Sequence, residues 1–516
     1  MEFLVPKVTE LLHREIREGG YHSVSDEETA GFANIISHTL QADPDLATLL
    51  PINPNNNELF EKVHNGVILC KLINAAQPGT IFEKAINNKA NMNIFQIKEN
   101  LNMAINAAKA IGCVVVSIFP ESIIEKKDYL ILGLVWQIVR ILMMSKINLK
   151  SHPELIKLVE PGEDLSDLLK LHPEMILLRW FNYHLKNSGT AKRIGNFDND
   201  LKDSEAYTLL LHQIEPHHCD LSALSESDHL ARAERVIINA RRMGVEAFVS
   251  PSSIVGGNTK LNLIFIAEIF NKNPGLHATE QELYEAAGLI NDDVEGTREE
   301  RAFRMWINSL NIDGLFINNL YEDVKDGLAL LKVIERVEPG RINWKRVEMK
   351  TNHRLKKLAN CGLVIEYGRA LGFTLVGVGN MDIVDGHKKL ILGYVWQLVR
   401  FATLKVIGSQ TEESLMKWAN GRVTQHASNF RDKSISSGIF LIQLYGSIEP
   451  RAVNHELVTP GQDTEGKEQN AKYALSLARS LGASVFCVWE DIVEANPKMI
   501  MTLVATAFHL ASTYHS

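Results

Sequence analysis

The sequence lacks the marks of a secreted, membrane-spanning or nucleic-acid-binding protein. Its five cysteines among 516 residues are odd in number, scattered and never spaced as Cys-x-x-Cys, which indicates reduced thiols inside a cell. The most apolar run, residues 129–144, contains Gln137 and Arg140 and is too short and too polar to cross a bilayer of about 30 Å. No charged-then-apolar signal sequence opens the chain. A net charge of −8 gives no global basic excess. We therefore expect a soluble, cytoplasmic protein without nucleic-acid or membrane partners.

Catalytic signatures are equally scarce. The chain contains no Gly-x-Gly-x-x-Gly, Gly-x-x-x-x-Gly-Lys-Ser/Thr or Gly-x-Ser-x-Gly motif. His-His-Cys-Asp at residues 217–220 is the densest cluster of ligand-type residues, but neighbours on a short loop rarely converge on one metal without a second ligand group. An enzyme that uses His217 and His218 would need bound metal. The sequence predicts no catalytic residue, no metal site and no cofactor.

What the sequence does contain is an internal duplication. Residues 130–140, Leu-Ile-Leu-Gly-Leu-Val-Trp-Gln-Ile-Val-Arg, return almost unchanged at residues 390–400, which is an offset of 260 residues. A second pair, residues 71–79 and 332–340, keeps nearly the same offset of 261. Two whole halves were therefore copied, and the function should depend on what two copies can do that one cannot.

Each half is itself double. A glycine followed 10 to 12 residues later by isoleucine occurs four times, at Gly112, Gly244, Gly372 and Gly482. A Trp-x-Asn motif opens three of the repeats, at Trp180/Asn182, Trp306/Asn308 and Trp418/Asn420, whereas the first repeat has Ile35 and Ser37 there. Four repeats of about 130 residues follow, each long enough to bury its own core.

The repeats are predicted to be helical throughout. Apolar residues cover nearly the whole circumference of 261–270 and of the duplicated segments at 130 and 390, so we expect these helices to be central. Residues 232–244 form an amphipathic pattern with a basic face, and Gly244 stands where a left-handed residue would end the helix. Four dipeptides predict helix starts capped by a polar side chain, namely Asn65-Gly66, Asp203-Ser204, Asp326-Gly327 and Ser437-Gly438.

Composition sets the expected boundaries. We expect an N-terminal segment at 1–25, repeats at 26–148, 173–275, 299–406 and 412–516, a linker at 149–172, and an acidic, flexible linker between the halves at 276–298. Short linkers within the halves and a longer one between them indicate two tandem pairs. We also expect buried contact between the first and fourth repeats, because a compact core would hold the two halves rigidly.

These features resemble the calponin-homology domains of the fimbrin and plastin family. The resemblance rests on the Trp-x-Asn openings, the Ala-Ile-Gly-Cys stretch at 110–113, the Leu-Val-Trp-Gln and Tyr-Val-Trp-Gln helices and the run at 261–271, and it extends from about residue 26 to 513. It implies an all-α fold of four calponin-homology domains arranged as two tandem actin-binding domains. It also implies a monomer on the actin cytoskeleton that bridges two filaments and bundles them.

Two departures from the family pattern stand out. Fimbrins usually carry a pair of EF-hands ahead of the first calponin-homology domain, but residues 1–25 contain no such calcium loop. We expect either a core fragment or a calcium-insensitive member. Ile35 and Ser37 replace Trp and Asn in the opening helix of the first repeat, which is an actin-contact element in the family.

By resemblance, three elements of each half face the filament: the opening helix of the odd repeat, its last helix, and the opening helix of the next repeat. They correspond to residues 32–40, 136–146 and 176–186, and to residues 304–310, 396–405 and 415–422. We expect exposed apolar side chains ringed by basic ones. The candidate actin-binding residues are Phe32, Ile35, Ile36, Arg140, Lys146, Arg179, Lys186, Arg304, Arg400, Lys405, Lys417 and Arg422.

Structural interpretations compete with these binding ones. The recurring tryptophans are interpreted as core residues, because aromatic residues on amphipathic helices usually face the core. Seven basic residues between Arg341 and Lys357 could guide the chain to an acidic filament or could form a solvated loop. The basic face of 232–242 is interpreted as solvated.

Two binding hypotheses remain. In the first, both halves bind actin and one monomer bridges two filaments. In the second, one half binds well and the other is a scaffold or an auto-inhibitory module, which gives a single-filament side binder. The duplicated helices favour the first hypothesis, and the divergent Ile35 and Ser37 keep the second open.

Overall fold

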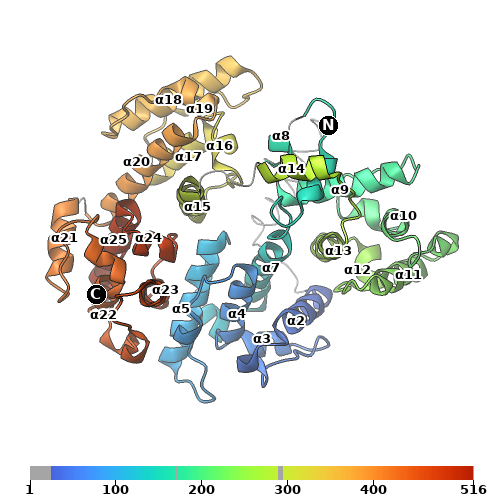
Figure 1. Ribbon diagram of the computed structural model, residues 1–516, viewed down its shortest axis with the longest axis horizontal. Coiled ribbons are helices and arrows are strands. Elements are labelled where there is room, and N and C mark those ends of the chain that lie inside the picture. Colours follow the sequence, from blue (N-terminus) through green and yellow to red (C-terminus); the bar gives the residue numbers. More distant parts are fainter. Residues whose placement is uncertain (1–24, 164, 170, 289–293, 409, 515–516) are drawn as a thin grey trace. The chain divides into compact units, whose positions relative to one another are not determined.

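The computed structural model describes residues 25–163, 165–169, 171–288, 294–408 and 410–514. Within these ranges every regular element is an α-helix or a 3-10 helix (Figure 1), which confirms the predicted all-α fold class. No helix in these ranges is long and apolar enough to cross a membrane. Nearly all of the N-terminal segment predicted at 1–25 lies outside the described residues.

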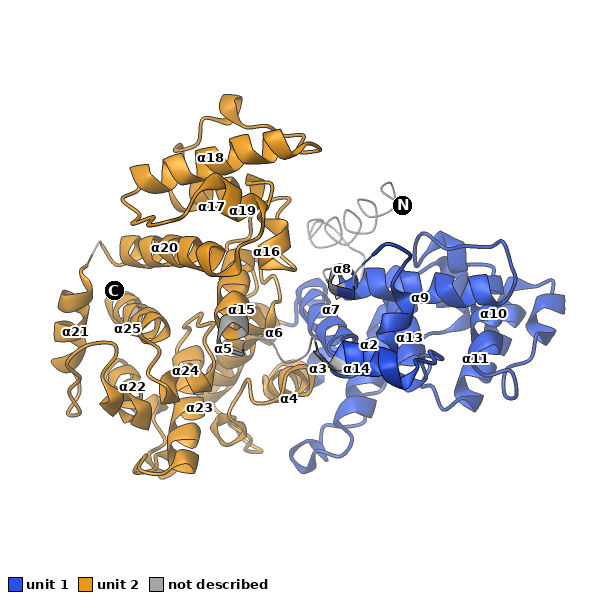
Figure 2. Ribbon diagram, turned by 45° about the horizontal axis from the view of Figure 1, so that its top comes forward, with its two compact units in different colours: residues 1–62, 126–292 blue, residues 63–125, 293–516 orange. Residues whose placement is uncertain are grey.

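The chain forms two compact units, which divide the first repeat between them (Figure 2). Unit 1 contains residues 1–62 and 126–292, and unit 2 contains residues 63–125 and 293–516. The first repeat therefore contributes its opening and last helices to unit 1 and its middle helices to unit 2.

Unit 1 is built around one apolar helix. Its helices are α2 (Asp26–Leu40), α3 (Glu58–Val63, which ends at the unit boundary), α7 (Asp128–Met144), α8 (Leu165–Leu169), α9 (Pro173–Asn187), α10 (Glu205–Ile214), α11 (His229–Arg242), α12 (Pro251–Gly256), α13 (Thr259–Lys272) and α14 (Glu280–Gly288). Helix α13 packs on α2, α7 and α9 and buries nine of its fourteen residues. The expected central position of 261–270 is confirmed.

In unit 2, the third and fourth repeats share one continuous hydrophobic core, against which Phe82 and Ala85 of the first repeat pack. Its helices are α4 (Val67–Ala76), α5 (Ile94–Ile111), α6 (Pro120–Ile124), α15 (Val294–Ser309), α16 (Leu320–Asp323), α17 (Leu328–Val337), α18 (Arg354–Ala370), α19 (Asn380–Val384), α20 (Lys388–Val406), α21 (Glu412–Asn420), α22 (Ile439–Gly446), α23 (Thr464–Ser480), α24 (Trp489–Val493) and α25 (Pro497–Tyr514). Helix α20 packs on both α15 and α25, so the third and fourth repeats share this core.

The expected contact between the first and fourth repeats lies within unit 2. Helix α5 packs along α23, and its polar side chains reach the backbone and hydroxyls of the fourth repeat. The Asn106 amide donates a hydrogen bond to the Arg479 carbonyl at 3.2 Å, and the Lys109 ammonium donates one to the Ser484 hydroxyl at 3.2 Å. This buried contact confirms the prediction.

Part of the segment predicted to be a flexible acidic linker is helical. Helix α14 packs against the 3-10 helix η3 (Pro153–Leu158), and Lys157 forms a 3.1 Å ion pair with Glu282. Glu282 also accepts a hydrogen bond from the Thr279 backbone at the start of the helix. Acidic side chains in the first turn of a helix are stabilised by the positive end of the helix dipole. The acidic composition therefore supports a helix here. The expectation of a flexible chain is therefore wrong for residues 280–288.

The Trp-x-Asn motif has a structural role. Each of its asparagines both donates to and accepts from the backbone of one residue beyond the helix, in the pairs Asn182–Ile194, Asn308–Ile317 and Asn420–Ala427. In the first repeat, Ser37 accepts a 2.9 Å hydrogen bond from the Ile52 backbone and donates one to the Ala33 carbonyl. Ser37 therefore keeps half of the bridge that asparagine makes elsewhere.

Tryptophans of the motif and of the duplicated helices pack in the cores. Trp136 and Trp180 are buried in unit 1, and Trp306, Trp396 and Trp418 are partly buried against the core of unit 2. Their interpretation as core residues is confirmed. Gly244 follows α11 with a φ of 75°, as expected of a left-handed residue after a helix.

Candidate binding surfaces

Both halves dock their two repeats through the same set of contacts. In the first half, Glu28 on α2 forms a 2.9 Å ion pair with Lys260 on α13, and the Lys260 ammonium lies 5.9 Å from the Trp136 ring centre. The second half repeats this arrangement with Glu299, Lys498 and Trp396, at 2.8 and 6.0 Å. Each half is therefore one tandem pair, with the opening and last helices of its odd repeat fixed to its even repeat.

The opening helix α2 turns its predicted contact residues inward. Phe32, Ile35 and Ile36 are fully buried, and the Phe32 ring stacks on Trp136 at 6.1 Å. Their spacing of three and four residues places them on one face of the helix, which is the core face. The prediction that these three side chains contact a filament is wrong for this arrangement. Any surface that α2 offers lies on its opposite face.

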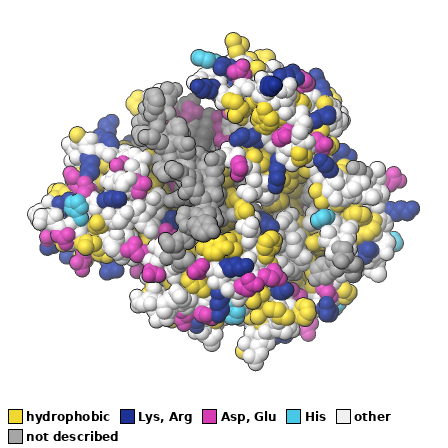
Figure 3. Space-filling model, turned by 180° about the vertical axis from the view of Figure 1, so that it is seen from behind, with side chains coloured by type: hydrophobic (Ala, Val, Ile, Leu, Met, Phe, Trp, Pro, Cys, Tyr) yellow, Lys and Arg dark blue, Asp and Glu magenta, His cyan; other side chains and the backbone are white. Residues whose placement is uncertain are grey.

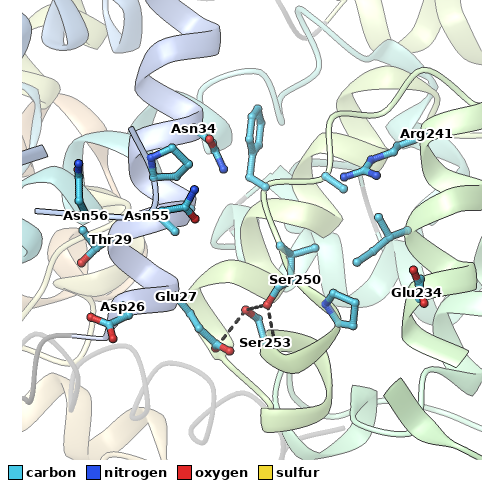
Figure 4. A pocket seen from close by; sticks show the side chains of 18 of the residues that line it. Asp26, Glu27, Thr29, Asn34, Asn55, Asn56, Glu234, Arg241, Ser250 and Ser253 are labelled. Carbon is cyan, nitrogen blue, oxygen red and sulfur yellow. Dashed lines mark hydrogen bonds between the residues drawn. The ribbon is translucent and has the colours of Figure 1, made fainter. Parts of the chain in front are cut away.

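The N-terminal turns of α2 border an open groove toward the second repeat (Figure 4). Figure 4 shows Asp26, Glu27 and Asn34 on one wall, and Glu234 and Arg241 from α11 on the other. Glu27 accepts a hydrogen bond from Ser253 at 3.1 Å, which closes one end. The groove encloses about 690 Å³ and carries more acidic than basic groups.

Arg140, near the end of α7, is held by the second repeat. Its guanidinium pairs with Glu174 at the start of α9, and the Glu174 side chain is completely buried. Arg140 therefore neutralises a buried carboxylate, and little of it can reach a partner. Nothing in the local sequence indicates that the pair forms, because its two members are 34 residues apart. Lys146, just beyond the helix, is exposed.

Of the two candidate residues of α9, one is held in an ion pair and the other is exposed. The Arg179 guanidinium pairs with Glu163 at 2.6 Å and lies 3.4 Å from the Leu158 carbonyl, so it fastens the preceding segment to the helix. Lys186, in the last turn, is exposed. In the first half, therefore, Lys146 and Lys186 are the candidate cations that remain on the surface.

In the second half, three candidates form ion pairs within unit 2. Arg304 pairs with Glu300 one turn earlier at 2.9 Å and is half-buried. Arg400 pairs with Glu412 at 2.8 Å, and Lys405 pairs with Glu338 at 2.5 Å. The last two pairs are exposed, so a filament could compete for Arg400 and Lys405 more readily than for Arg140.

Helix α21 presents the remaining two candidates. Lys417 is exposed and borders a groove that contains Trp396 and Met416. Arg422 is exposed and lies over the Trp418 ring at 4.9 Å. This surface brings cations next to partly buried aromatic and sulfur side chains, as expected of a protein interface.

The other charged clusters resemble solvated surface. Three residues of the basic segment 341–357 form exposed ion pairs, Arg346 with Glu366, Arg354 with Asp385 and Lys356 with Glu348. On the face shown in Figure 3, Lys and Arg side chains are interspersed with Asp and Glu. His217 and His218 are exposed. Among the described residues, no three His, Cys, Asp or Glu side chains are grouped so that they could hold a metal ion.

Known proteins match this arrangement closely. The calponin homology (CH) domain family matches the chain four times, at residues 46–143, 171–275, 297–403 and 409–513. Fimbrin-5 of Arabidopsis thaliana is 42% identical over 504 residues, which cover 95% of this chain and 73% of that protein. The chain belongs to the fimbrin and plastin family. Plastin-3 of Homo sapiens is 41% identical over 514 residues, which cover 95% of this chain and 80% of the relative.

A solved fimbrin structure has the same architecture. The crystal structure of the actin-crosslinking core of Schizosaccharomyces pombe fimbrin aligns with a TM-score of 0.82 and 36% identity, covering 94% of this chain and 100% of that one. The predicted fold of four CH domains is thereby confirmed. The four repeats are called CH domains from here on.

Proposed function

We propose that this chain crosslinks actin filaments into bundles, with each tandem pair of CH domains binding one filament. The observation that carries the proposal is the duplicated docking of Glu28, Lys260 and Trp136 in one half and Glu299, Lys498 and Trp396 in the other. It docks the two CH domains of each half in the same way, within a family whose fimbrin core is named for actin crosslinking. Two sites on one chain make the second contact intramolecular once a bundle has started.

Within each half, we assign filament binding to the exposed cations near the junction of the two CH domains. These are Lys146 and Lys186 in the first half, and Arg400, Lys405, Lys417 and Arg422 in the second. The second-half surface combines positive charge with neighbouring apolar side chains, which suits an acidic filament. Arg140, Arg179 and Arg304 are assigned structural roles, since each is half-buried in an ion pair.

The test is co-sedimentation of filamentous actin with the full chain at low and high speed, because only bundles pellet at low speed. One variant carries Lys146→Glu and Lys186→Glu, and the other carries Lys417→Glu and Arg422→Glu. We expect each variant to keep high-speed binding through the intact half but to lose bundling. Reversing two interface charges should weaken the altered half about tenfold or more.

A matched control uses the basic segment 341–357, in which three residues already form ion pairs within unit 2. Lys345→Glu and Lys350→Glu introduce the same charge change at two exposed positions of the third CH domain that are not assigned to filament binding. Bundling should be unchanged. If this control abolishes bundling as well, the effect reflects net charge and the residue assignment is wrong.

The alternative, a single-filament side binder, is favoured by one observation. In the first half, Arg140 and Arg179 are engaged by Glu174 and Glu163, which leaves fewer exposed candidate cations than in the second half. In this case the Lys417→Glu/Arg422→Glu variant would lose all actin binding, and the full chain would not pellet actin at low speed.

We further infer that the chain works as a cytoplasmic monomer on the actin cytoskeleton, with no nucleic-acid or membrane partner. Bridging requires only the two sites of one chain, so self-association is unnecessary. Light scattering of the free chain should give a mass near 57.8 kDa.

A further inference from the structure

A small cavity in unit 2 lies where the first, third and fourth CH domains meet. It encloses about 130 Å³ and is lined by Arg301 from α15, Arg479 from α23, residues 77–80 of the first CH domain, and Glu490 at the start of α24. A volume of this size holds several waters or one small polyatomic ion. The cavity is distinct from the surfaces assigned to filament binding.

Arg479 is a buried cation in this cavity. Its side chain is 3% exposed, and its two terminal nitrogens donate to the carbonyls of Thr80, at 2.5 Å, and Val485, at 3.3 Å. The buried Nε of Arg479 has no hydrogen-bond partner in the described part of the chain. A buried donor left without a partner is costly, so something polar is expected to satisfy it.

The second arginine makes the cavity more positive. Among the described residues, Glu490 is the single acidic residue lining the cavity. The charges of Glu300 and Glu490 both act on Arg301, but Glu300 is itself paired with Arg304 at 2.9 Å. Burial, together with the nearby charge of Arg301, lowers the pKa of Arg479 to about 10. Arg479 is therefore still charged at neutral pH, and burial also lowers the pKa of Arg301. Two neighbouring guanidinium groups against one carboxylate leave a net positive charge that an anion could neutralise.

We propose that this cavity binds inorganic phosphate between Arg301 and Arg479. Guanidinium groups suit tetrahedral oxyanions because their N–H groups form a planar fork that matches two oxygens at once. The small volume favours the free ion over a phosphorylated side chain or a nucleotide. Bound phosphate would link the third and fourth CH domains directly. Arg479 also donates a hydrogen bond to the Thr80 carbonyl, so bound phosphate would also stabilise the contact of the first CH domain with the fourth.

The first half provides an internal control. Phe32 and Phe303 occupy equivalent places, each stacked on the tryptophan of its last odd-domain helix, so Ala30 stands where Arg301 stands. Arg241 is the counterpart of Arg479, since each precedes its glycine, Gly244 or Gly482, by three residues. Arg241 is exposed in the 690 Å³ groove, which also contains Asp26, Glu27 and Glu234. A lone exposed arginine among acidic groups should not hold phosphate.

The test is thermal unfolding of the full chain in increasing sodium phosphate, against sodium chloride at equal ionic strength. Phosphate stabilises most proteins weakly by exclusion from their surface, and that effect grows without saturation. A ligand that binds only the folded state behaves differently. Once its site is filled, it raises the stability in proportion to the logarithm of the ligand concentration. Isothermal titration with phosphate therefore measures the site directly. We expect heat with a stoichiometry near one per chain in the wild type.

The variant Arg301→Ala gives the third CH domain the residue found in the first, and Arg241→Ala is its matched control. We expect Arg301→Ala to lose the titration heat and the phosphate-specific rise in Tm, and Arg241→Ala to keep both. If Arg301→Ala does not fold, Arg301→Gln takes its place, since it removes the charge and keeps a donor. Equal phosphate responses in the wild type and the Arg301 variant would overturn the proposal.

A direct view comes from crystals of the full chain soaked in selenate, a tetrahedral oxyanion with an anomalous signal. A peak between Arg301 and Arg479 supports the site, and water alone overturns it. Competition separates the possible sources of phosphate. Phosphoserine or ATP that displaces inorganic phosphate with equal affinity would contradict the assignment to the free ion, whereas failure of both to compete supports it.

Discussion

The two halves of this molecule contain the same ion pair in very different surroundings. In the first half, Arg140 on α7 pairs with Glu174 on α9, with side chains 19% and 0% exposed. In the second half, the equivalent Arg400 on α20 pairs with Glu412 on α21, with side chains 42% and 45% exposed. Each pair joins the last helix of an odd CH domain to the opening helix of the next.

The difference shows that the duplicated halves keep the same contact, although its contribution to stability differs between them. Helices α7 and α9 are separated by a connection whose element η3 packs on both α9 and α14, so the first half has added structure around this junction. In the second half, α20 ends at Val406 and α21 begins at Glu412, with no room for such an element. Burial raises the cost of breaking a pair, whereas solvent screens an exposed pair.

The largest effect is expected from Arg140→Ala. It leaves the completely buried Glu174 carboxylate without its cation, which should destabilise the junction by about 3–5 kcal/mol. Hydrogen exchange measured on peptides from α7 and α9 reports the local opening free energy. Exchange in α20 and α21 should be unchanged.

A double variant distinguishes the lost partner from lost packing. Arg140→Met with Glu174→Leu replaces both members by apolar side chains of similar size, and should recover most of the stability. If Arg140→Ala costs less than about 1 kcal/mol, water reaches the Glu174 carboxylate, which contradicts its complete burial in the structure.

Acidity should affect the two halves in opposite directions, by on the order of 2 kcal/mol each. Burial lowers the pKa of His184, in the first half, from 6.5 to about 4. Its neutral form is favoured in the fold, so its stabilising effect is complete above pH 6.5 and is lost as the pH falls toward 4. Burial raises the pKa of Asp491, in the second half, from 3.8 to about 6. Its protonated form is favoured, so its stabilising effect is complete below pH 3.8 and is lost as the pH rises through 6.

The measurement is the Tm difference between each variant and the wild type from pH 4 to 8. His184→Gln keeps a donor for the Pro274 carbonyl, which His184 Nε2 contacts at 2.9 Å, and should become relatively more stable as the pH falls. Asp491→Asn should become relatively more stable as the pH rises. Parallel curves for the two variants would show that one of the two burial assignments is wrong.

Sequence patterns predicted the repeats and their helices well, and side-chain exposure poorly. Helices α7 and α13 are apolar over nearly their whole circumference, and that pattern requires burial wherever their neighbours lie. The prediction for Phe32, Ile35 and Ile36 is wrong because it rests on the family resemblance, whereas their spacing marks a core face. The burial of Glu174 and Arg479 depends on partners distant in sequence. Local periodicity contains no information about such contacts.

The helix-opening motif gives a smaller contrast. Asn308→Ala removes two hydrogen bonds to the Ile317 backbone and leaves both groups unsatisfied, which should cost about 2 kcal/mol. Ser37→Ala removes the acceptor of the Ile52 N–H and should cost about 1 kcal/mol. Urea unfolding of the two variants tests this order. If Ser37→Ala is the more damaging change, the serine is more than a partial substitute for asparagine.

The smallest effect is expected from Arg400→Ala, the counterpart of the first prediction. Arg400 and Glu412 are both about two-fifths exposed, so water replaces the lost partner, and the change should cost less than about 1 kcal/mol. Raising the salt concentration should reduce even this cost, because exposed charges are screened. Actin binding supplies a second measurement, since Arg400 is assigned to the filament surface and Arg140 is not. Arg400→Ala should weaken co-sedimentation with little loss of stability. The reverse result, a large loss of stability with unchanged actin binding, would mean that the two junctions are alike after all.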